Sequence, residues 1–424
     1  MPGFATRTAC VFLLLASCGA RAADTGNNFS GTRSAELSAL GDRLFRDARF
    51  EDAEAAYSQA LDFDPQNLSA HLGMGKIADL LSQPRRAAGQ YAAAYRIAPH
   101  NPESILAFAG VVEDSEARQT LFRNFLAFAR DARVEDVRAR LHIEKRIARE
   151  ALSTLTSPSQ PYRIPLSPVR TSGMAVRARI NGGRDLKLIL DTGATGIVLN
   201  KSAGSETDLE ILTAAALSGY GSSAPSAAHK ALATSLETGA LKIANLLLVV
   251  SETDLAKDAD GMIGLDVFRN FLVRLDLPEQ TLELTPFVDP PAASCSGCLR
   301  AYRLEHMLLV QGTVNGHADG YFILDSGSPF TMISRKLMCE EGSPATFTGA
   351  QGSQAVLLPR GPVNIRLGNW RLTESDYATF DSSEISSRYG TEIAGAIGFS
   401  VLRDMSLTVD YRSGMVKLAK SVRR

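Results

Sequence analysis

An internal duplication limits what the second half of this chain can become. Four motifs recur 134 residues further on, in the same order, so insertions and deletions between the copies cancel. The pairs are Asn181-Gly182 and Asn315-Gly316, Leu190-Asp191-Thr192-Gly193 and Leu324-Asp325-Ser326-Gly327, Gly261-Met262-Ile263-Gly264 and Gly395-Ala396-Ile397-Gly398, and Asp276 and Asp410. Two copies of one sequence pattern predict two copies of one structural unit.

The duplicated half has the residue pattern of an all-β protein. Short runs rich in apolar and β-branched residues, such as 174–180 and 186–190, are separated by turns that contain glycine. We therefore expect two β lobes, at residues 169–288 and 301–421. A linker at residues 289–300 would join them.

Each copy contains an aspartate that directly follows an apolar run. Asp191 follows Leu188-Ile189-Leu190, and Asp325 follows Phe322-Ile323-Leu324. An aspartate beside a glycine is usually a turn residue, but that does not explain two copies that each end a buried strand. The turn interpretation suits other aspartates of this half, namely Asp266, Asp276 and Asp410. Two carboxylates within hydrogen-bond reach share a proton, so the pair can both accept a proton from water and donate one to a carbonyl.

The pattern resembles the aspartic peptidases of the retroviral and pepsin types. In that family an apolar strand enters Asp-Thr/Ser-Gly, and an apolar-apolar-Gly strand crosses behind it. Here the crossing strands are Met262-Ile263-Gly264 and Ala396-Ile397-Gly398, and the resemblance covers about residues 165–420. It implies a bilobal fold, a catalytic dyad of Asp191 and Asp325 within one chain, a polypeptide substrate, and neither a metal nor a cofactor.

The resemblance also implies roles for the neighbours of the two aspartates. Thr192 and Ser326 would form hydrogen bonds across the lobe interface, and Gly193 and Gly327 would let the opposing backbone and a water approach. The family closes a hairpin flap over its substrate. The candidates for hairpin tips are Gly219, Tyr220 and Gly221 in the first lobe and Gly349 and Gly352 in the second. Lobes of this length are closer to the retroviral type, and Pro329 after the second motif departs from the family pattern.

Residues 33–155 are expected to be helical and to repeat with a period of 34. The repeated positions are Gly41 and Gly75, Ala53 and Ala87, Tyr57 and Tyr91, Ala60 and Ala94, and Pro65 and Pro99. They resemble the tetratricopeptide repeat, and this resemblance implies a concave surface that recruits a protein partner or substrate. Residues from about 102 to 152 lack the glycine and proline, and predict a degenerate third repeat with a capping helix. Four prolines predict a linker at residues 156–168.

The first 22 residues have the features of an export signal. Arg7 precedes an apolar run at 11–16 that is too short to span a bilayer. Two processing sites compete: Ala20-Arg21-Ala22 fits an ordinary secretory signal, whereas Leu15-Ala16-Ser17-Cys18 resembles the bacterial lipobox, in which Cys18 would be acylated. We expect an exported protein that is either periplasmic or anchored to a membrane by a lipid at Cys18.

Cysteine usage favours a structural pair over a metal site. Beyond the signal only Cys295, Cys298 and Cys339 remain. In an oxidising compartment Cys295 and Cys298 would form a disulfide in the linker between the lobes. A redox or zinc role is the alternative, but a structural zinc site takes about four ligands and the sequence offers no matching second pair.

Composition and the remaining motifs exclude several classes of function. A net charge of −1 gives no basic field for nucleic acid. Gly73-Met74-Gly75-Lys76-Ile77-Ala78 imitates a dinucleotide fingerprint but does not follow a strand. The sequence has neither a Gly-x-Ser-x-Gly elbow nor a His-Glu-x-x-His helix. Two alternatives stay open beside a single-chain endopeptidase: a non-catalytic module that holds a peptide or glycan, and an enzyme whose lobes pair between two chains.

Overall fold

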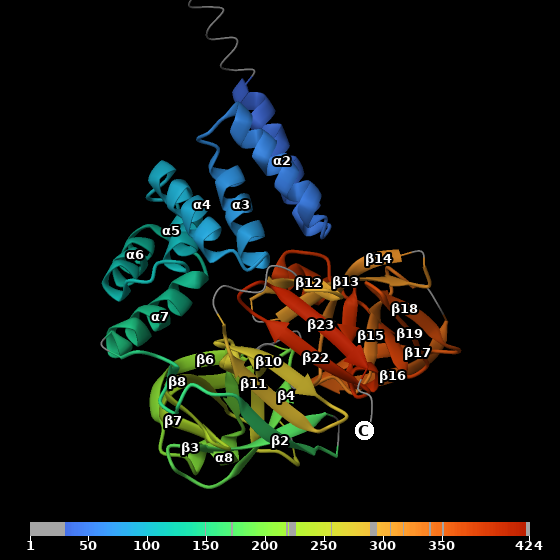
Figure 1. Cartoon of the computed structure of the whole chain (residues 1–424). Coiled ribbons are helices and arrows are strands. Elements are labelled where there is room, and N and C mark those ends of the chain that lie inside the picture. The colour runs from blue at the N-terminus through green and yellow to red at the C-terminus, as the bar shows by residue number, and fades with distance from the viewer. Residues whose placement is uncertain are drawn as a thin grey trace, which may run out of the picture.

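An all-helical region at residues 30–147 precedes a β-rich region (Figure 1), in the order that the expected fold class gives them. The computed structural model describes residues 30–148, 150–170, 173–217, 219, 226–255, 257–288, 295–305, 307–316, 318–338, 341–349 and 352–420. The predicted export signal with Cys18, the residues Tyr220 and Gly221, and Cys339 lie outside the described residues. No helix among the described residues is long and apolar enough to cross a bilayer.

Each helix of the N-terminal region packs against the helix that follows it in the sequence. The first covers residues 30–46, and it is followed by α2 (Phe50–Phe63), α3 (Leu68–Leu80), α4 (Pro84–Ile97), α5 (Pro102–Ala109), α6 (Ser115–Phe128) and α7 (Arg133–Ile147). Their starts follow from the sequence. Pro84 and Pro102 occupy first-turn positions, where a missing N–H costs nothing. The side chains of Asn67 and Asp114 accept hydrogen bonds from the first-turn amides of α3 and α6.

The positions that repeat every 34 residues lie where helices meet. Tyr57 and Tyr91 are buried, and their hydroxyls donate to Asp42 at 2.7 Å and to Asp79 at 2.9 Å. A Cβ placed on Gly75 would lie 2.2 Å from the Tyr91 ring, so only glycine fits there. The motif that imitates a dinucleotide fingerprint therefore lies inside α3 and serves helix packing. Assignment to the tetratricopeptide family stays a prediction.

The two lobes repeat the same strand pairings around their aspartates. In the first lobe β4 (Leu186–Asp191) pairs in parallel with β9 (Gly261–Gly264). There β5 (Ile197–Leu199) pairs antiparallel with β9 and in parallel with β8 (Leu241–Ser251). The second lobe has the same three pairings, of β14 (Ala318–Leu324) with β21 (Gly395–Ile397), of β15 (Thr331–Ser334) with β21, and of β15 with β20 (Tyr377–Phe380). The duplicated sequence thus folds into duplicated topology.

The elements of the first lobe are β1 (Thr154–Leu155), β2 (Tyr162–Pro168), β3 (Met174–Ile180), β4 (Leu186–Asp191), β5 (Ile197–Leu199), α8 (Lys201–Ser205), β6 (Glu210–Leu217), β7 (Ser226–Thr238), β8 (Leu241–Ser251), β9 (Gly261–Gly264), a 3-10 turn (Leu265–Phe268), β10 (Phe271–Asp276) and β11 (Thr281–Pro286). Those of the second are β12 (Cys298–Leu304), β13 (Met307–Val314), β14 (Ala318–Leu324), β15 (Thr331–Ser334), β16 (Gly342–Gly349), β17 (Gly352–Pro359), β18 (Val363–Leu367), β19 (Trp370–Glu374), β20 (Tyr377–Phe380), α9 (Ser383–Tyr389), β21 (Gly395–Ile397), α10 (Phe399–Leu402), β22 (Met405–Asp410) and β23 (Met415–Lys420).

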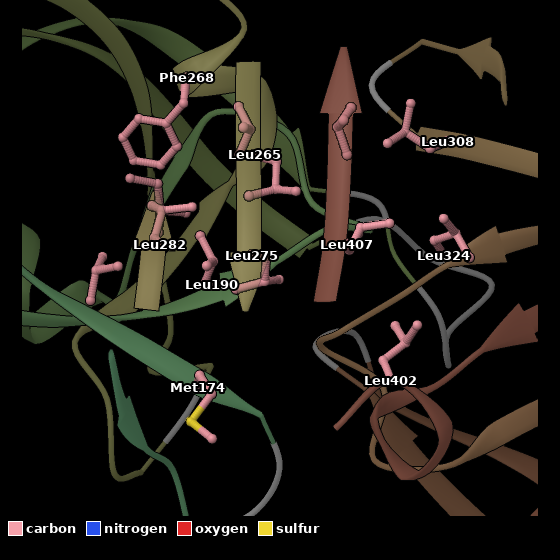
Figure 2. Close-up of a cluster of buried hydrophobic side chains, with 14 of the residues drawn as sticks. Met174, Leu190, Leu265, Phe268, Leu275, Leu282, Leu308, Leu324, Leu402 and Leu407 are labelled. Atoms are coloured by element: carbon pink, nitrogen blue, oxygen red, sulfur yellow. The ribbon is translucent and has the colours of Figure 1, made fainter. Parts of the chain in front are cut away.

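An antiparallel sheet joins the lobes in the order β2-β11-β10-β22-β23-β12. Its centre is the β10–β22 pair, in which Leu275 lies opposite Leu407. Figure 2 shows both side chains in one apolar cluster with Leu190 and Leu324, the residues that precede the two aspartates. The core therefore runs without interruption from one lobe into the other.

The two linkers predicted at residues 156–168 and 289–300 are shorter in the structure, because strands form within both segments. Residues 162–168 form β2, because Tyr162, Ile164 and Leu166 alternate into the core while the prolines face outward or end the strand. Likewise β12 begins at Cys298, inside the segment expected to link the lobes. A disulfide joins Cys298 to Cys295, with 5.5 Å between their Cα atoms.

The helical region contacts both lobes. Phe50 at the start of α2 packs against Tyr302 and Tyr321 of the second lobe, with ring centroids 5.0 and 4.8 Å apart. At the other end, α7 lies beside β6 (Figure 1), and Arg146 of α7 donates two hydrogen bonds of 2.6 Å to the carboxylate of Glu210 on β6.

Candidate active site

Both aspartates stand at the end of a buried central strand. Asp191 is the last residue of β4 and is paired in register with Gly264 of β9. Asp325 follows β14, and its backbone N–H donates to the carbonyl of Ile397 at 3.0 Å. The residues that precede the two aspartates, Leu190 and Leu324, belong to one apolar cluster, so the two strands bring their aspartates together.

Four hydrogen bonds tie the two aspartate loops together across the lobe interface. The Thr192 hydroxyl donates to the Leu324 carbonyl at 2.6 Å and accepts from the Ser326 N–H at 2.8 Å. The Ser326 hydroxyl donates to the Leu190 carbonyl at 2.9 Å and accepts from the Thr192 N–H at 3.1 Å. Both side chains are buried. This reciprocal arrangement is the one that the sequence predicts for Thr192 and Ser326, and it fixes the relative position of the neighbouring carboxylates.

The glycines after each aspartate face the opposite carboxylate. A Cβ on Gly327 would lie 2.4 Å from Cγ of Asp191, and one on Gly193 would lie 3.0 Å from Cγ of Asp325. Any side chain at Gly327 would therefore displace Asp191. The Gly193 N–H also donates to Asp191 Oδ1 at 2.7 Å, and the Gly327 N–H donates to Asp325 Oδ1 at 3.0 Å.

The two carboxyl groups interact directly but have different surroundings. A side-chain hydrogen bond links Asp325 to Asp191. Asp325 is buried, whereas Asp191 is half-buried. Burial first, and then the negative charge of Asp191, raise the pKa of Asp325 well above its ordinary value, although the Ser328 and Gly327 amides act in the opposite direction. Both effects favour Asp325 over Asp191 as the carboxyl that holds the shared proton.

The structure adds positions that the sequence interpretation left out. The N–H of Ser328 donates to Asp325 Oδ1 at 3.0 Å, so this carboxylate accepts two backbone hydrogen bonds where Asp191 accepts one that is described. Asp266, interpreted as a turn residue, accepts from the N–H of Gly196 at 2.9 Å and holds the loop beyond Asp191. A serine three residues after an aspartate is the signal that would have identified Ser328.

The predicted flap residues lie at hairpin tips where they are described. Gly349 and Gly352 face each other across the end of the β16–β17 hairpin. The carbonyl of Gly219, just beyond β6, accepts a hydrogen bond of 3.1 Å from Arg388 in the second lobe. A role as a flap stays a prediction for all of them. No group of three or more His, Cys, Asp and Glu side chains suited to a metal occurs in the described part of the chain.

Residues 176–267 match the aspartyl protease family model. The matched segment begins in β3 and includes Asp191, Thr192, Gly193 and the crossing strand β9, so it falls on the first copy of the duplicated unit. Asp325 lies in the second copy, beyond the matched segment. No curated protein matches the chain. The chain therefore carries an aspartyl protease domain after a helical region.

Proposed function

We propose that this protein is an aspartic endopeptidase whose dyad, Asp191 and Asp325, is built within one chain. The observation that carries the proposal is the convergence of the two carboxyl groups: they share a hydrogen bond, and one of them is buried with a raised pKa. Two carboxyl groups this close cannot both be ionised, so the pair shares a single proton. Acid–base hydrolysis by two carboxyl groups requires this protonation state.

The reaction follows from the unequal surroundings of the two groups. Asp191, the more exposed carboxylate, takes a proton from a water that attacks the carbonyl carbon of the peptide bond. Asp325 donates its proton to the carbonyl oxygen, which gives a tetrahedral diol. The diol collapses when a proton passes to the amide nitrogen and the C–N bond breaks, and the dyad then holds one proton again. The reaction consumes only water, so this chemistry requires neither metal nor cofactor.

The other parts of the chain complete the proposal. Residues 1–22 would direct export to the periplasm, or to a membrane surface if Cys18 is acylated, and the mass of the mature N-terminus distinguishes the two. The helical repeats would recruit a protein partner or substrate. Because α2 and α7 contact different lobes, a partner held by the helices would lie close to the protease domain.

Single substitutions of the dyad test the proposal. Purified protein is incubated with an acid-denatured protein substrate between about pH 3 and 7, and new N-termini are counted. Asp191→Asn and Asp325→Asn are each expected to lower kcat by at least about 10²–10⁴-fold, the range typical of a lost acid or base. Asp185→Asn, an exposed aspartate paired with Arg179, serves as the matched control and should leave kcat unchanged. Undiminished cleavage by either dyad variant would refute the proposal.

A further inference from the structure

A separate cavity lies where the helical region meets the first lobe. Its volume is about 430 Å³, within the range of roughly 300–1,000 Å³ that is usual for ligand pockets. Helices α5, α6 and α7 supply one wall, and β5, β7 and β8 supply the other. Its lining includes the apolar side chains of Phe122, Ile143, Ile197 and Leu247, and the charged side chain of Lys230.

The walls are apolar, and most of the polar groups in them already have partners. Arg118 pairs with Glu144 at 2.7 Å and donates to the carbonyl of Val112 at 3.1 Å. Ser115 donates to the second oxygen of Glu144 at 3.0 Å. Arg140, at the rim, pairs with Asp136 at 2.7 Å. In each pair the two charges neutralise each other, so these residues form the wall of the cavity and need no charged group from a ligand.

Lys230 differs from these residues because its charge has no partner among the described residues. It lies on β7, opposite Val249 of β8, is half-buried, and its ammonium has neither an ion-pair nor a hydrogen-bond partner among the described residues. The cavity therefore has an apolar interior and one uncompensated positive charge. An occupant that complements it has an apolar group next to an anion, because a neutral occupant would leave the charge unpaired.

The cavity is continuous with the loop that carries Asp191. Thr195, Gly196 and Ile197 line it, and Thr195 is four residues from Asp191. A chain spans at most about 3.6 Å per residue, so the two Cα atoms lie within about 14 Å of each other. Four or five residues of an extended peptide are therefore enough to reach from Asp191 to the Thr195 wall of the cavity. Gly196 is also held in place by hydrogen bonds to Asp266 and Gly264, so the position of this wall relative to Asp191 is fixed.

We propose that this cavity is a remote substrate-recognition site, which takes an apolar side chain flanked by Asp or Glu, about four or five residues from the scissile bond. Lys230 recognises the carboxylate, and the helices and the first lobe enclose the apolar side chain. The proposal rests on the peptidase function proposed above and names its substrate class. The continuity with the Asp191 loop favours a polypeptide segment over a free fatty acid, although either would combine an apolar group with an anion.

Cleavage specificity provides the first test. Wild type and variants digest a mixture of peptides, and mass spectrometry reads the sequence around each cut. We expect wild type to enrich Asp or Glu beside an apolar residue at the remote position. Lys230→Gln should lose this preference and raise KM about five- to tenfold for acidic peptides with kcat unchanged, because only ground-state binding is removed. Lys230→Glu should reverse the preference towards Lys or Arg. Lys242→Gln, an exposed lysine that pairs with Glu237, is the matched control.

Binding without cleavage separates the failure of this inference from the failure of the peptidase proposal. In the Asp191→Asn background, fluorescence anisotropy follows a labelled peptide with the core Leu-Leu-Glu-Gly and its Leu-Leu-Gln-Gly counterpart. The acidic peptide should bind more tightly, and Lys230→Gln should abolish the difference. Equal binding of both peptides, or an unchanged preference in Lys230→Gln and Lys230→Glu, overturns the inference. Binding of dodecanoate at Lys230 without binding of the acidic peptide also overturns it.

Discussion

At the scale of single residues, two chemically identical side chains differ in protonation because they differ in burial. Asp325 is buried and next to the charge of Asp191, and both effects raise its pKa. Its two backbone donors, from Gly327 and Ser328, oppose that rise but do not cancel it. The proton that the proposed reaction needs is therefore held at Asp325, while Asp191 has the better access to water.

The first prediction concerns the pH dependence of catalysis. Because the proposed reaction needs Asp325 protonated, kcat/KM should fall as pH rises through its raised pKa. It should also fall at the acid end, where Asp191 gains a proton. The curve of kcat/KM between about pH 2.5 and 8 is expected to have a bell shape whose two limbs belong to the pair. Activity that keeps rising into the alkaline range would contradict this assignment.

The second prediction concerns stability. A carboxyl whose pKa is raised on folding binds its proton more tightly in the folded state. Its contribution to stability is thus complete below the unfolded pKa of about 3.9, and is lost as pH rises towards the folded pKa. Asp325→Asn retains an acceptor for Gly327 and Ser328 but has no charge to bury. The Tm of the variant minus the Tm of wild type should therefore rise as pH increases from about 3 to 7. Each kcal/mol of stability that wild type loses should change this difference by about 2–4 °C. A difference in Tm independent of pH would count against the raised pKa.

The third prediction concerns the hydrogen bonds between the loops. Thr192→Val keeps the shape of the side chain but leaves the Ser326 N–H and the Leu324 carbonyl without their cross-lobe partner. Each buried group left unsatisfied costs about 1–3 kcal/mol, so the two groups together should lower the unfolding free energy by about 2–6 kcal/mol. Urea denaturation measures it. Thr192→Ser, which retains the hydroxyl, should lose much less, and an equal loss in both variants would assign the effect to packing.

At the scale of elements, α7 fastens the helical region to the first lobe. Ile143 and Ile147 pack against Leu212 of β6 and Leu232 of β7, and the Arg146 ion pair with Glu210 lies beside them at the surface. Exposed ion pairs contribute little to stability, so the apolar contact carries most of the attachment.

The fourth prediction tests that attachment. Ile147→Ala should destabilise the protein by about 2–4 kcal/mol, because it removes a buried side chain from the contact between α7 and the β6–β7 hairpin. Leu152→Ala, in a residue that is 36% exposed, should change stability by less than about 0.5 kcal/mol. Limited proteolysis after residue 147 reports detachment directly. Equal resistance of Ile147→Ala and wild type to both denaturant and protease would show that other contacts hold the helices in place.

At the scale of the whole molecule, local repetition was readable from the sequence, and the joining of parts was not. Two apolar runs that end in Asp-Thr-Gly and Asp-Ser-Gly predict paired lobes, and the duplicated strand pairings agree with that. In contrast, Pro165 and Pro168 favoured a linker where β2 forms, because the sequence does not say which edge a strand joins. Phe50 and Tyr302 are distant in the sequence, so no local sequence pattern predicts their contact.

In the proposed mechanism, Asp191 and Asp325 act together on one oxygen atom. A crystal structure of the protein with a statine-type inhibitor at mildly acid pH tests it most directly. We predict that the inhibitor hydroxyl lies within about 2.6–3.2 Å of an oxygen of each carboxyl group, in place of the attacking water. An inhibitor hydroxyl in contact with only one carboxyl, or the two carboxyls turned away from a common point, would contradict the account.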